Sequence, residues 1–174
     1  MAALATTLVL GGARSGKSTF AERLLRDSGL PCTFIATATA GDEEMRERIA
    51  RHRAERDKSW RTIEEPLALA EVLARESAAE CAILVDCLTL WLSNMMHADC
   101  NVETETESLL AAIGGTRSLL VLVSNEVGLG IVPDTPLGRR FRDAQGRLNQ
   151  KVAAAVPNVV LLAAGLPLWL KRAT

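Results

Sequence analysis

The fold is decided by residues 8–19, which read Leu8-Val9-Leu10-Gly11-Gly12-Ala13-Arg14-Ser15-Gly16-Lys17-Ser18-Thr19. This stretch contains the pattern G-x-x-x-x-G-K-[ST], which Gly11 opens and Gly16-Lys17-Ser18 closes. The glycines let the backbone curl so that several N–H groups point at phosphate oxygens, and the lysine reaches the β- and γ-phosphates. An apolar run precedes the pattern and an amphipathic helical pattern follows it. We therefore predict a phosphate-binding loop, or P-loop, between a first strand and a first helix.

Apolar runs and helical patterns alternate along the rest of the chain. Five apolar runs are continuous, as expected of parallel strands covered on both faces: Thr7–Leu10, Thr33–Ala36, Ala82–Val85, Leu119–Val123 and Val159–Ala163. Helical patterns occupy Lys17–Ser28, Asp42–Glu55, Leu67–Glu76, Leu88–Met96, Glu103–Ile113 and Leu137–Val156. The alternation predicts an α/β fold with a mostly parallel sheet.

Two segments depart from this alternation of strands and helices. Residues 158–172 are predicted to form two strands joined at Gly165-Leu166-Pro167, a connection short enough for a hairpin, so the last strand is expected to be antiparallel. The polar segment Ala98–Ser108 receives no role from its sequence.

The composition indicates one globular domain over residues 1–174, because 174 residues of which 48% are hydrophobic bury one core. Lys and Arg number 20 against 21 Asp and Glu, so no nucleic-acid partner is expected. No apolar run reaches the roughly 18–20 residues of a membrane span. Residues 1–10 run directly into the glycine loop and lack the basic start of a signal peptide, so a cytoplasmic protein is expected. The four cysteines form no CxxC pair and indicate reduced thiols instead of a zinc site.

Asp86 ends the apolar run that starts at Cys81. P-loop proteins place an acidic residue at the end of a later strand, where it binds Mg²⁺ directly or through water. The alternative is that Asp86 caps the helix predicted to start near Leu88, a role that aspartate favours. The two roles are compatible.

His52 lies in a basic helical segment, Arg46-Glu47-Arg48-Ile49-Ala50-Arg51-His52-Arg53-Ala54-Glu55-Arg56. It shares one helical face with Met45 and Ile49. Neighbouring arginines disfavour the imidazolium form, which keeps the ring neutral and nucleophilic near pH 7, and the same cations suit phosphates. The alternatives are a histidine that only packs, and arginines that form a solvated face paired with glutamates at helical spacing.

A glycine-punctuated loop follows the strand predicted to end at Val123. Ligands of open α/β sheets bind at the carboxyl ends of strands, so Asn125 and Glu126 are placed near a substrate. A purely structural turn is the alternative at this position.

Taken together, these segments resemble the bifunctional adenosylcobinamide kinase/adenosylcobinamide-phosphate guanylyltransferase family of cobalamin biosynthesis over nearly the whole chain. The segments that carry the resemblance are Gly11–Ser18, Ile35–Ala38, Arg48-Ile49 with His52-Arg53 and Arg56, Trp60–Glu64, Asn125–Pro133, Phe141–Asp143 and Gly146–Gln150. The P-loop alone is generic, whereas this combination in this order is highly specific.

The resemblance implies two reactions. ATP or GTP phosphorylates the aminopropanol hydroxyl of adenosylcobinamide, and GTP then transfers GMP to the new phosphate through a guanylyl-histidine, which places the nucleophile at His52. It also implies a RecA-like fold with six parallel strands and one antiparallel strand, and a homotrimer. The P-loop pattern itself places the Ser18 hydroxyl to bind Mg²⁺, with Asp86 as the other candidate ligand. Lys17 is expected to be catalytic as well as a nucleotide contact. The residues implied to contact the nucleotide are Gly11, Gly12, Ala13, Arg14, Ser15, Gly16, Lys17, Ser18, Thr37, Ala38, Thr39, Arg53, Ala54, Glu55, Arg56, Glu64 and Asp86.

The sequence departs from the family pattern in two respects, and two alternative functions stay open. The family often has glutamate where this chain has Asp86, so the shorter side chain favours a contact through water, and some members lack the kinase step. A simple small-molecule kinase would need the P-loop and leave His52 idle. A GTP-dependent switch would need an N-K-x-D guanine motif, which the sequence does not contain.

Overall fold

A computed structural model describes residues 6–41, 43, 46–47, 50 and 59–173. Its described strands form one seven-stranded sheet in the order β3-β2-β4-β5-β1-β6-β7. The strands are β1 (Thr7–Gly11), β2 (Cys32–Ala36), β3 (Arg61–Glu64), β4 (Ala82–Asp86), β5 (Leu119–Asn125), β6 (Asn158–Ala163) and β7 (Leu166–Lys171). The helices are α1 (Lys17–Arg26), α3 (Leu69–Glu76), α4 (Leu88–His97), α5 (Val102–Gly115) and α6 (Pro136–Ala155). Among the strands of the described residues, only β7 runs antiparallel to its neighbour, so the predicted α/β fold with six parallel strands and one antiparallel strand is confirmed.

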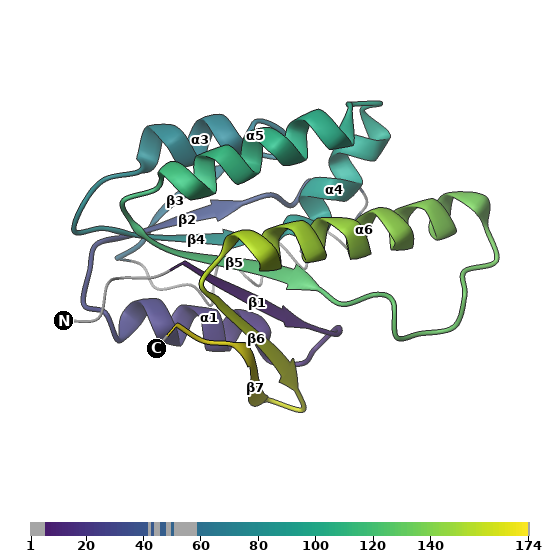
Figure 1. The fold of residues 1–174 in the computed structure, drawn as a ribbon. Helices are drawn as coiled ribbons and strands as arrows, with labels where there is room; N and C mark the ends of the chain where they lie inside the picture. Colours follow the sequence, from purple (N-terminus) through teal and green to yellow (C-terminus); the bar gives the residue numbers. More distant parts are fainter. Residues whose placement is uncertain (1–5, 42, 44–45, 48–49, 51–58, 174) are drawn as a thin grey trace.

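The described helices cover both faces of the sheet (Figure 1). Helices α3, α4, α5 and α6 pack on one face, where Leu8 and Leu10 of β1 point into a large apolar cluster. Helix α1 packs on the other face, where Val9 joins a second cluster with Phe20 and Leu25. Successive side chains of β1 therefore enter different cores, which explains why its sequence is a continuous apolar run.

The five strands predicted from apolar runs are all present, but β3 was missed. Its four residues, Arg61 to Glu64, are mostly exposed, because it is an edge strand that pairs only with β2 among the described strands. A short polar edge strand contains no apolar run from which it could be predicted.

The predicted C-terminal hairpin exists, but its turn was placed too late, by one residue at its start and by two at its end. Ala164 and Gly165 form the connection with φ of 52° and 79°, so Leu166 and Pro167 already belong to β7. Both turn residues have the left-handed conformation that two-residue hairpins require. Pro167 is tolerated because β7 is an edge strand.

The segment Ala98–Ser108 contains a turn followed by the first half of α5. Asn101 is the N-cap of this helix, and its side-chain oxygen accepts from the N–H groups of Glu103 and Thr104. The polar character of the segment thus reflects a capped helix start. The helix predicted over Asp42–Glu55 falls largely outside the described residues.

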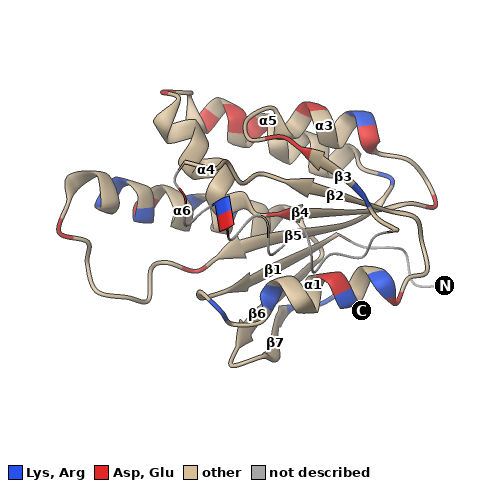
Figure 2. Ribbon diagram, turned by 180° about the vertical axis from the view of Figure 1, so that it is seen from behind, with Lys and Arg blue, Asp and Glu red and all other residues tan. Residues whose placement is uncertain are grey.

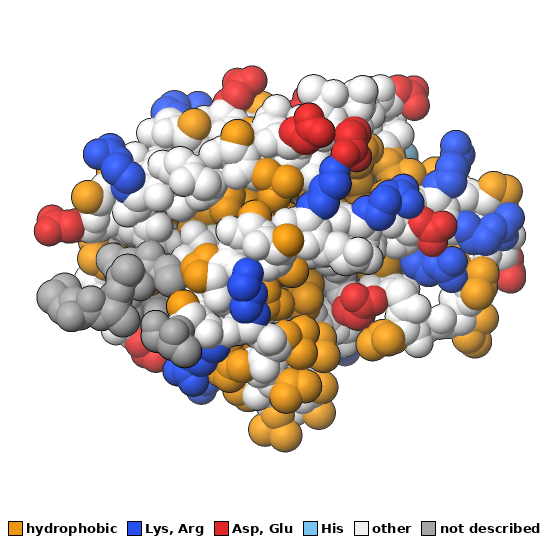
Figure 3. All heavy atoms as spheres, viewed as in Figure 1, with side chains coloured by type: hydrophobic (Ala, Val, Ile, Leu, Met, Phe, Trp, Pro, Cys, Tyr) orange, Lys and Arg blue, Asp and Glu red, His pale blue; other side chains and the backbone are white. Residues whose placement is uncertain are grey.

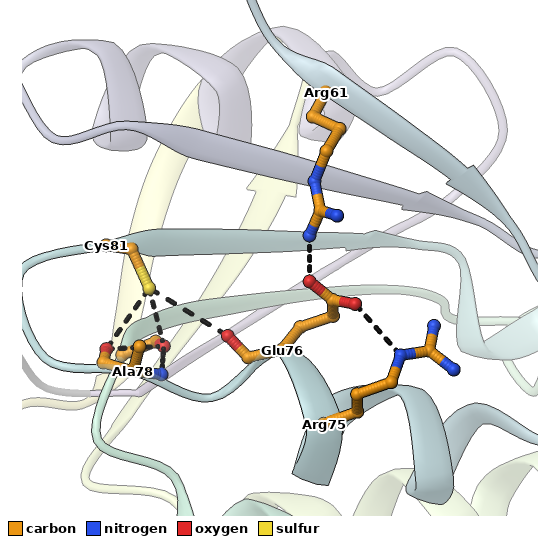
Figure 4. A network of polar contacts seen from close by, with 6 residues as sticks. Arg61, Arg75, Glu76, Ala78 and Cys81 are labelled. Atoms are coloured by element: carbon orange, nitrogen blue, oxygen red, sulfur yellow. Dashed lines mark hydrogen bonds and ion pairs between the residues drawn. The ribbon is translucent and has the colours of Figure 1, made fainter.

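Polar contacts join several elements at the amino ends of the parallel strands, opposite the P-loop (Figure 4). The Glu76 carboxylate at the end of α3 pairs with Arg61 of β3 and with Arg75. Cys81, just before β4, donates its S–H to the Ala78 carbonyl at 3.1 Å. These contacts tie α3, β3 and β4 together at the edge that is remote from the predicted site.

None of the helices in the described part of the chain combines the length and the apolar character of a membrane-spanning segment.

Candidate active site

The parallel strands end in register at one edge of the sheet, and most of the predicted site residues lie along that edge. Ala36 of β2 pairs with both Glu64 of β3 and Asp86 of β4. On the other side of β4, Gly11 of β1 pairs with Asn125 of β5. Segments that are separated by up to about a hundred residues in sequence are therefore brought to one carboxyl edge, where open α/β folds bind ligands.

The P-loop has the backbone geometry that its glycines predict. A side chain at Gly11 would place its Cβ 2.4 Å from Ser15 Oγ and 2.8 Å from the Leu162 carbonyl, so only glycine fits. Gly16 caps α1 in the left-handed region, with φ of 92°. Lys17 begins α1 and donates from Nζ to the Gly12 carbonyl at 2.8 Å, so its ammonium already lies over the loop.

Two neighbouring segments hold the loop from outside. The N–H of Gly165, in the β6–β7 turn, donates to the Ser15 carbonyl at 3.0 Å, and the N–H of Glu126 donates to the Gly11 carbonyl at 3.0 Å. No sequence pattern indicates that the C-terminal hairpin supports the P-loop. Gly165 predicts a turn at this position, but it does not predict that the turn contacts the P-loop.

The fit of a phosphate to this loop is supported by an unsatisfied hydroxyl. Ser15 Oγ is buried and has no hydrogen-bond partner among the described residues. Buried polar groups are nearly always hydrogen-bonded, and a phosphate oxygen would accept this hydroxyl proton. The backbone N–H groups at the start of α1 add the positive end of a helix dipole.

Asp86 ends β4 and is half-buried, and it is not a helix cap: Cys87 is the N-cap residue of α4 and makes no side-chain cap bond. The capping alternative is therefore wrong. Ser18, in the first turn of α1, is also half-buried. A hydroxyl and a carboxylate are the hard oxygen donors that Mg²⁺ prefers, so these two residues fit that ion.

The pKa of the Cys87 thiol reflects its burial and the charges of Asp86 and Lys17 around it. Burial first, and the Asp86 carboxylate second, raise the pKa of the Cys87 thiol to about 12, while Lys17 opposes the increase. Both charged groups therefore act on the same buried thiol from different elements. A buried cysteine of high pKa is inert, so Cys87 is not a candidate nucleophile.

We predict that iodoacetamide at a pH of about 8.5, where an ordinary cysteine is half ionised, spares Cys87 in the folded protein. The thiolate is the reacting form, and a raised pKa leaves almost none of it at that pH. Peptide mass spectrometry is expected to show faster labelling at the half-buried Cys81 and Cys100. Labelling of all sites in urea is the control, and equal rates at Cys87 and Cys81 in the folded chain would contradict the assignment.

Asn94 of α4 joins the loops that follow β2 and β3. Its Nδ2 donates to the carbonyl of Thr37 at 2.7 Å and to that of Pro66 at 3.1 Å, and its Oδ1 accepts from the Thr39 hydroxyl at 3.2 Å. The Thr37 hydroxyl in turn donates to the Cys87 carbonyl at 2.7 Å and accepts from its N–H at 2.9 Å. Sequence reasoning missed Asn94, although an asparagine within an apolar helical run was a usable signal.

We predict that Asn94→Ala weakens nucleotide binding by about tenfold, because the loop of predicted contacts at residues 37–39 loses its fixed position. Removing a half-buried amide also leaves two carbonyls without their donor, at a cost of about 1–3 kcal/mol in stability. The measurement is titration with a fluorescent GTP analogue. Asn101→Ala is the control, because loss of this cap costs about 1 kcal/mol far from the loop. A similar loss of affinity in both variants would show that the effect is only general destabilisation.

A buried amide network holds the end of β5. Asn149 and Gln145 of α6 contact the Ser124 hydroxyl, at 2.7 Å and 3.0 Å respectively. Asn149 Nδ2 also donates to the Asn125 carbonyl at 3.0 Å, while the Thr89 hydroxyl accepts from the Asn125 N–H at 2.7 Å. Asn125 is thus fixed beside Gly11 by contacts from α4 and α6. Thr89 and Gln145 were not predicted, and Asn149 was named only as part of the segment Gly146–Gln150, without a role.

The remaining predicted residues divide into two groups. Gly12, Ala13 and Arg14 form the exposed part of the P-loop, and Glu64 is exposed at the end of β3. Ala38 and Thr39 follow β2 at the same edge. His52, Arg53, Ala54, Glu55 and Arg56 lie outside the described residues.

Solved structures share this fold at low sequence identity. The flagellar accessory protein FlaH from Methanocaldococcus jannaschii superposes with a TM-score of 0.55 at 12% identity, over 97% of this chain and 79% of that chain. The RadB recombinase gives a TM-score of 0.52 at 13% identity, over 91% of this chain and 74% of that chain. At these identities the likeness shows the fold alone.

The sheet order and the glycine loop define the class: this is a P-loop nucleotide-binding enzyme with a RecA-like fold. Residues 7–170 match the family described as cobinamide kinase/cobinamide phosphate guanyltransferase. The chain belongs to this family of bifunctional enzymes.

Two relatives align with this chain over nearly their full length. The bifunctional adenosylcobalamin biosynthesis protein CobP of Pseudomonas aeruginosa is 52% identical over 166 residues, which are 94% of this chain and 96% of the relative. The bifunctional adenosylcobalamin biosynthesis protein CobU of Escherichia coli (strain K12) is 38% identical over 179 aligned positions, covering 94% of this chain and 98% of the relative. The resemblance inferred from the sequence motifs is therefore confirmed.

Proposed function

We propose that the chain phosphorylates adenosylcobinamide with a nucleoside triphosphate and then transfers GMP from GTP to the new phosphate, giving adenosylcobinamide-GDP and pyrophosphate. The observation that supports this most directly is the P-loop at the carboxyl edge, in a chain of the cobinamide kinase/cobinamide phosphate guanyltransferase family. Phosphoryl transfer needs positioning and charge stabilisation more than covalent chemistry, and this edge supplies both.

In the kinase step, the aminopropanol hydroxyl oxygen attacks the γ-phosphorus. A new P–O bond forms, the bond from the γ-phosphorus to the bridging oxygen breaks, and the hydroxyl proton passes to solvent. The Lys17 ammonium, already over the loop, stabilises the negative charge that develops on the leaving diphosphate. The loop N–H groups and the Ser15 hydroxyl hold the phosphate oxygens in place.

In the guanylylation step, a ring nitrogen of His52 attacks the α-phosphorus of GTP. A P–N bond forms as pyrophosphate leaves, and a phosphate oxygen of adenosylcobinamide phosphate then displaces the imidazole to form the final P–O bond. A neutral imidazole suits this chemistry, because its phosphoramidate is reactive enough to pass GMP onward. The role of His52, and those of Arg53 and Arg56 as phosphate contacts, come from the family resemblance.

Ser18 and Asp86 are the residues that would hold Mg²⁺, directly or through water. When bound, this ion supplies positive charge that neutralises the phosphate oxygens. Thr37, Ala38, Thr39 and Glu64 complete the proposed nucleotide contacts, on strand ends that meet the P-loop edge.

The proposal is tested by incubating the purified protein with adenosylcobinamide, Mg²⁺ and GTP, and separately with ATP. Liquid chromatography with mass spectrometry is expected to show adenosylcobinamide phosphate first and adenosylcobinamide-GDP later, with one pyrophosphate released for each GDP product. Accumulation of the phosphate without the GDP product would indicate a simple kinase. Nucleotide hydrolysis without any corrinoid product would exclude both activities.

We also propose that the active form is a homotrimer, as the family resemblance implies. Light scattering coupled to size-exclusion chromatography measures the mass of the assembly directly. A monomeric mass in an active preparation would contradict this part of the proposal.

A further inference from the structure

Exposed apolar side chains gather on the loop that leaves β5 and enters α6. Leu129 is 86% exposed, Ile131 96% and Val132 57%, and Leu137 in the first turn of α6 is 50% exposed. Figure 3 shows hydrophobic side chains beside Lys and Arg at the end of the molecule where this loop and the start of α6 lie. Large apolar side chains that are exposed together on one loop can mark a binding surface.

The patch continues into a cavity between α4 and α6. This cavity of about 280 Å³ is lined by Met96 of α4, by Leu137 and Phe141 of α6, and by Thr135, the N-cap residue of α6. Most of its lining is apolar. We call Leu129, Ile131, Val132 and Leu137, together with this cavity, the loop patch.

The loop is held in shape at both ends. At its start, Glu126 Oε1 accepts from the Gly128 N–H at 2.6 Å. At its end, Arg139 Nη1 donates to the carbonyls of Pro133 and Asp134 at 3.0 and 2.9 Å. A patch presented by a braced loop loses less entropy on binding than a free segment would.

The start of this loop abuts the P-loop. Glu126 N–H donates to the Gly11 carbonyl at 3.0 Å, and Asn125 pairs with Gly11 in the sheet. The loop that carries the patch therefore starts at the edge at which the triphosphate is proposed to bind.

We propose that the loop patch binds the corrin macrocycle of the acceptor substrate, an inference that depends on the function proposed above. The acceptor hydroxyl must reach the end of a triphosphate in the P-loop, while the macrocycle, which is far larger than the reacting group, needs its own contact surface nearby. A corrin ring carries methyl groups and peripheral amides, so it matches an apolar surface bordered by hydrogen-bond donors. Figure 2 marks basic residues along the N-terminal half of α6, and Figure 3 shows Lys and Arg side chains at this end of the molecule.

The first test measures cobinamide binding by equilibrium dialysis in the presence of a non-hydrolysable GTP analogue. Leu129→Ser and Ile131→Ser are each expected to weaken cobinamide binding by about tenfold, the scale set by losing the burial of one large aliphatic side chain. Binding of the GTP analogue is expected to stay unchanged. Leu168→Ser and Leu170→Ser are the matched controls, because these β7 leucines are 58% and 57% exposed on another surface.

The second test uses the unaltered protein, so it does not depend on variants that fold. Cobinamide is expected to slow amide hydrogen exchange in residues 127–141 and to leave β7 unaffected. Protection elsewhere, or unchanged cobinamide affinity in both loop variants, overturns the inference and leaves the proposed function standing.

Two further outcomes are decisive. A lower assembly mass for the loop variants in light scattering would identify the loop patch as a contact between copies of the chain, and would overturn the inference. Failure of the unaltered protein to bind cobinamide would overturn the proposed function, and the inference with it.

Discussion

Lys17→Ala is expected to lower the rates of both half-reactions by at least about two orders of magnitude, the scale of a removed phosphate clamp. The Lys17 ammonium lies 2.8 Å from the Gly12 carbonyl, so it is positioned over the loop before any nucleotide binds. In the proposed steps, negative charge develops on the leaving group, which is a diphosphate in the first step and pyrophosphate in the second. We therefore expect one cation at the loop to serve both reactions, so that its loss affects both.

The measurement is the rate of adenosylcobinamide phosphate formation and, separately, the rate of GMP transfer to supplied adenosylcobinamide phosphate. Lys151→Ala is the matched control, because the Lys151 ammonium pairs with Glu103 between α5 and α6. Both variants are expected to unfold near the same urea concentration. A rate loss confined to one half-reaction would show that the two chemistries use different phosphate-binding groups.

The fold was predictable from the sequence where burial leaves a periodic signal. The strand at Thr7–Gly11 is buried at every position because both faces of the sheet are covered, and a Cβ at Gly11, where the P-loop begins, would clash with Ser15. β3 left no such signal, because only Ile63 among its four residues is shielded from solvent. The rule that found five strands therefore fails at the polar edge of the sheet.

The site was predictable where a residue's chemistry is local to its motif. Gly11, Lys17 and Asp86 follow from short patterns at strand ends, and the structure places them at one edge. Asn94 and Gly165 were missed because their partners lie 57 and 150 residues away in sequence, at Thr37 and Ser15. Tertiary contacts of this kind depend on the sheet order, which no local pattern contains.

His52→Asn is expected to abolish covalent labelling of the protein by α-labelled GTP. The guanylyl group is proposed to be held by a P–N bond to the imidazole, and an asparagine amide offers no nucleophilic lone pair in its place. Intact mass spectrometry after GTP treatment is expected to show one added GMP on the unaltered chain and none on the variant. The label is expected to be lost in acid and kept in base, as for other phosphoramidates.

The chain supplies a matched control, because it has two histidines, His52 and His97. His97 ends α4 with Nδ1 2.7 Å from the Ser93 carbonyl, a contact that completes the helix end, so His97→Asn is expected to label normally. His52→Asn is also expected to keep forming adenosylcobinamide phosphate, since the kinase step needs no covalent intermediate. Persistent acid-labile GMP on His52→Asn would remove this residue as the nucleophile, and loss of the kinase step together with labelling would indicate that His52 supports nucleotide binding in both reactions.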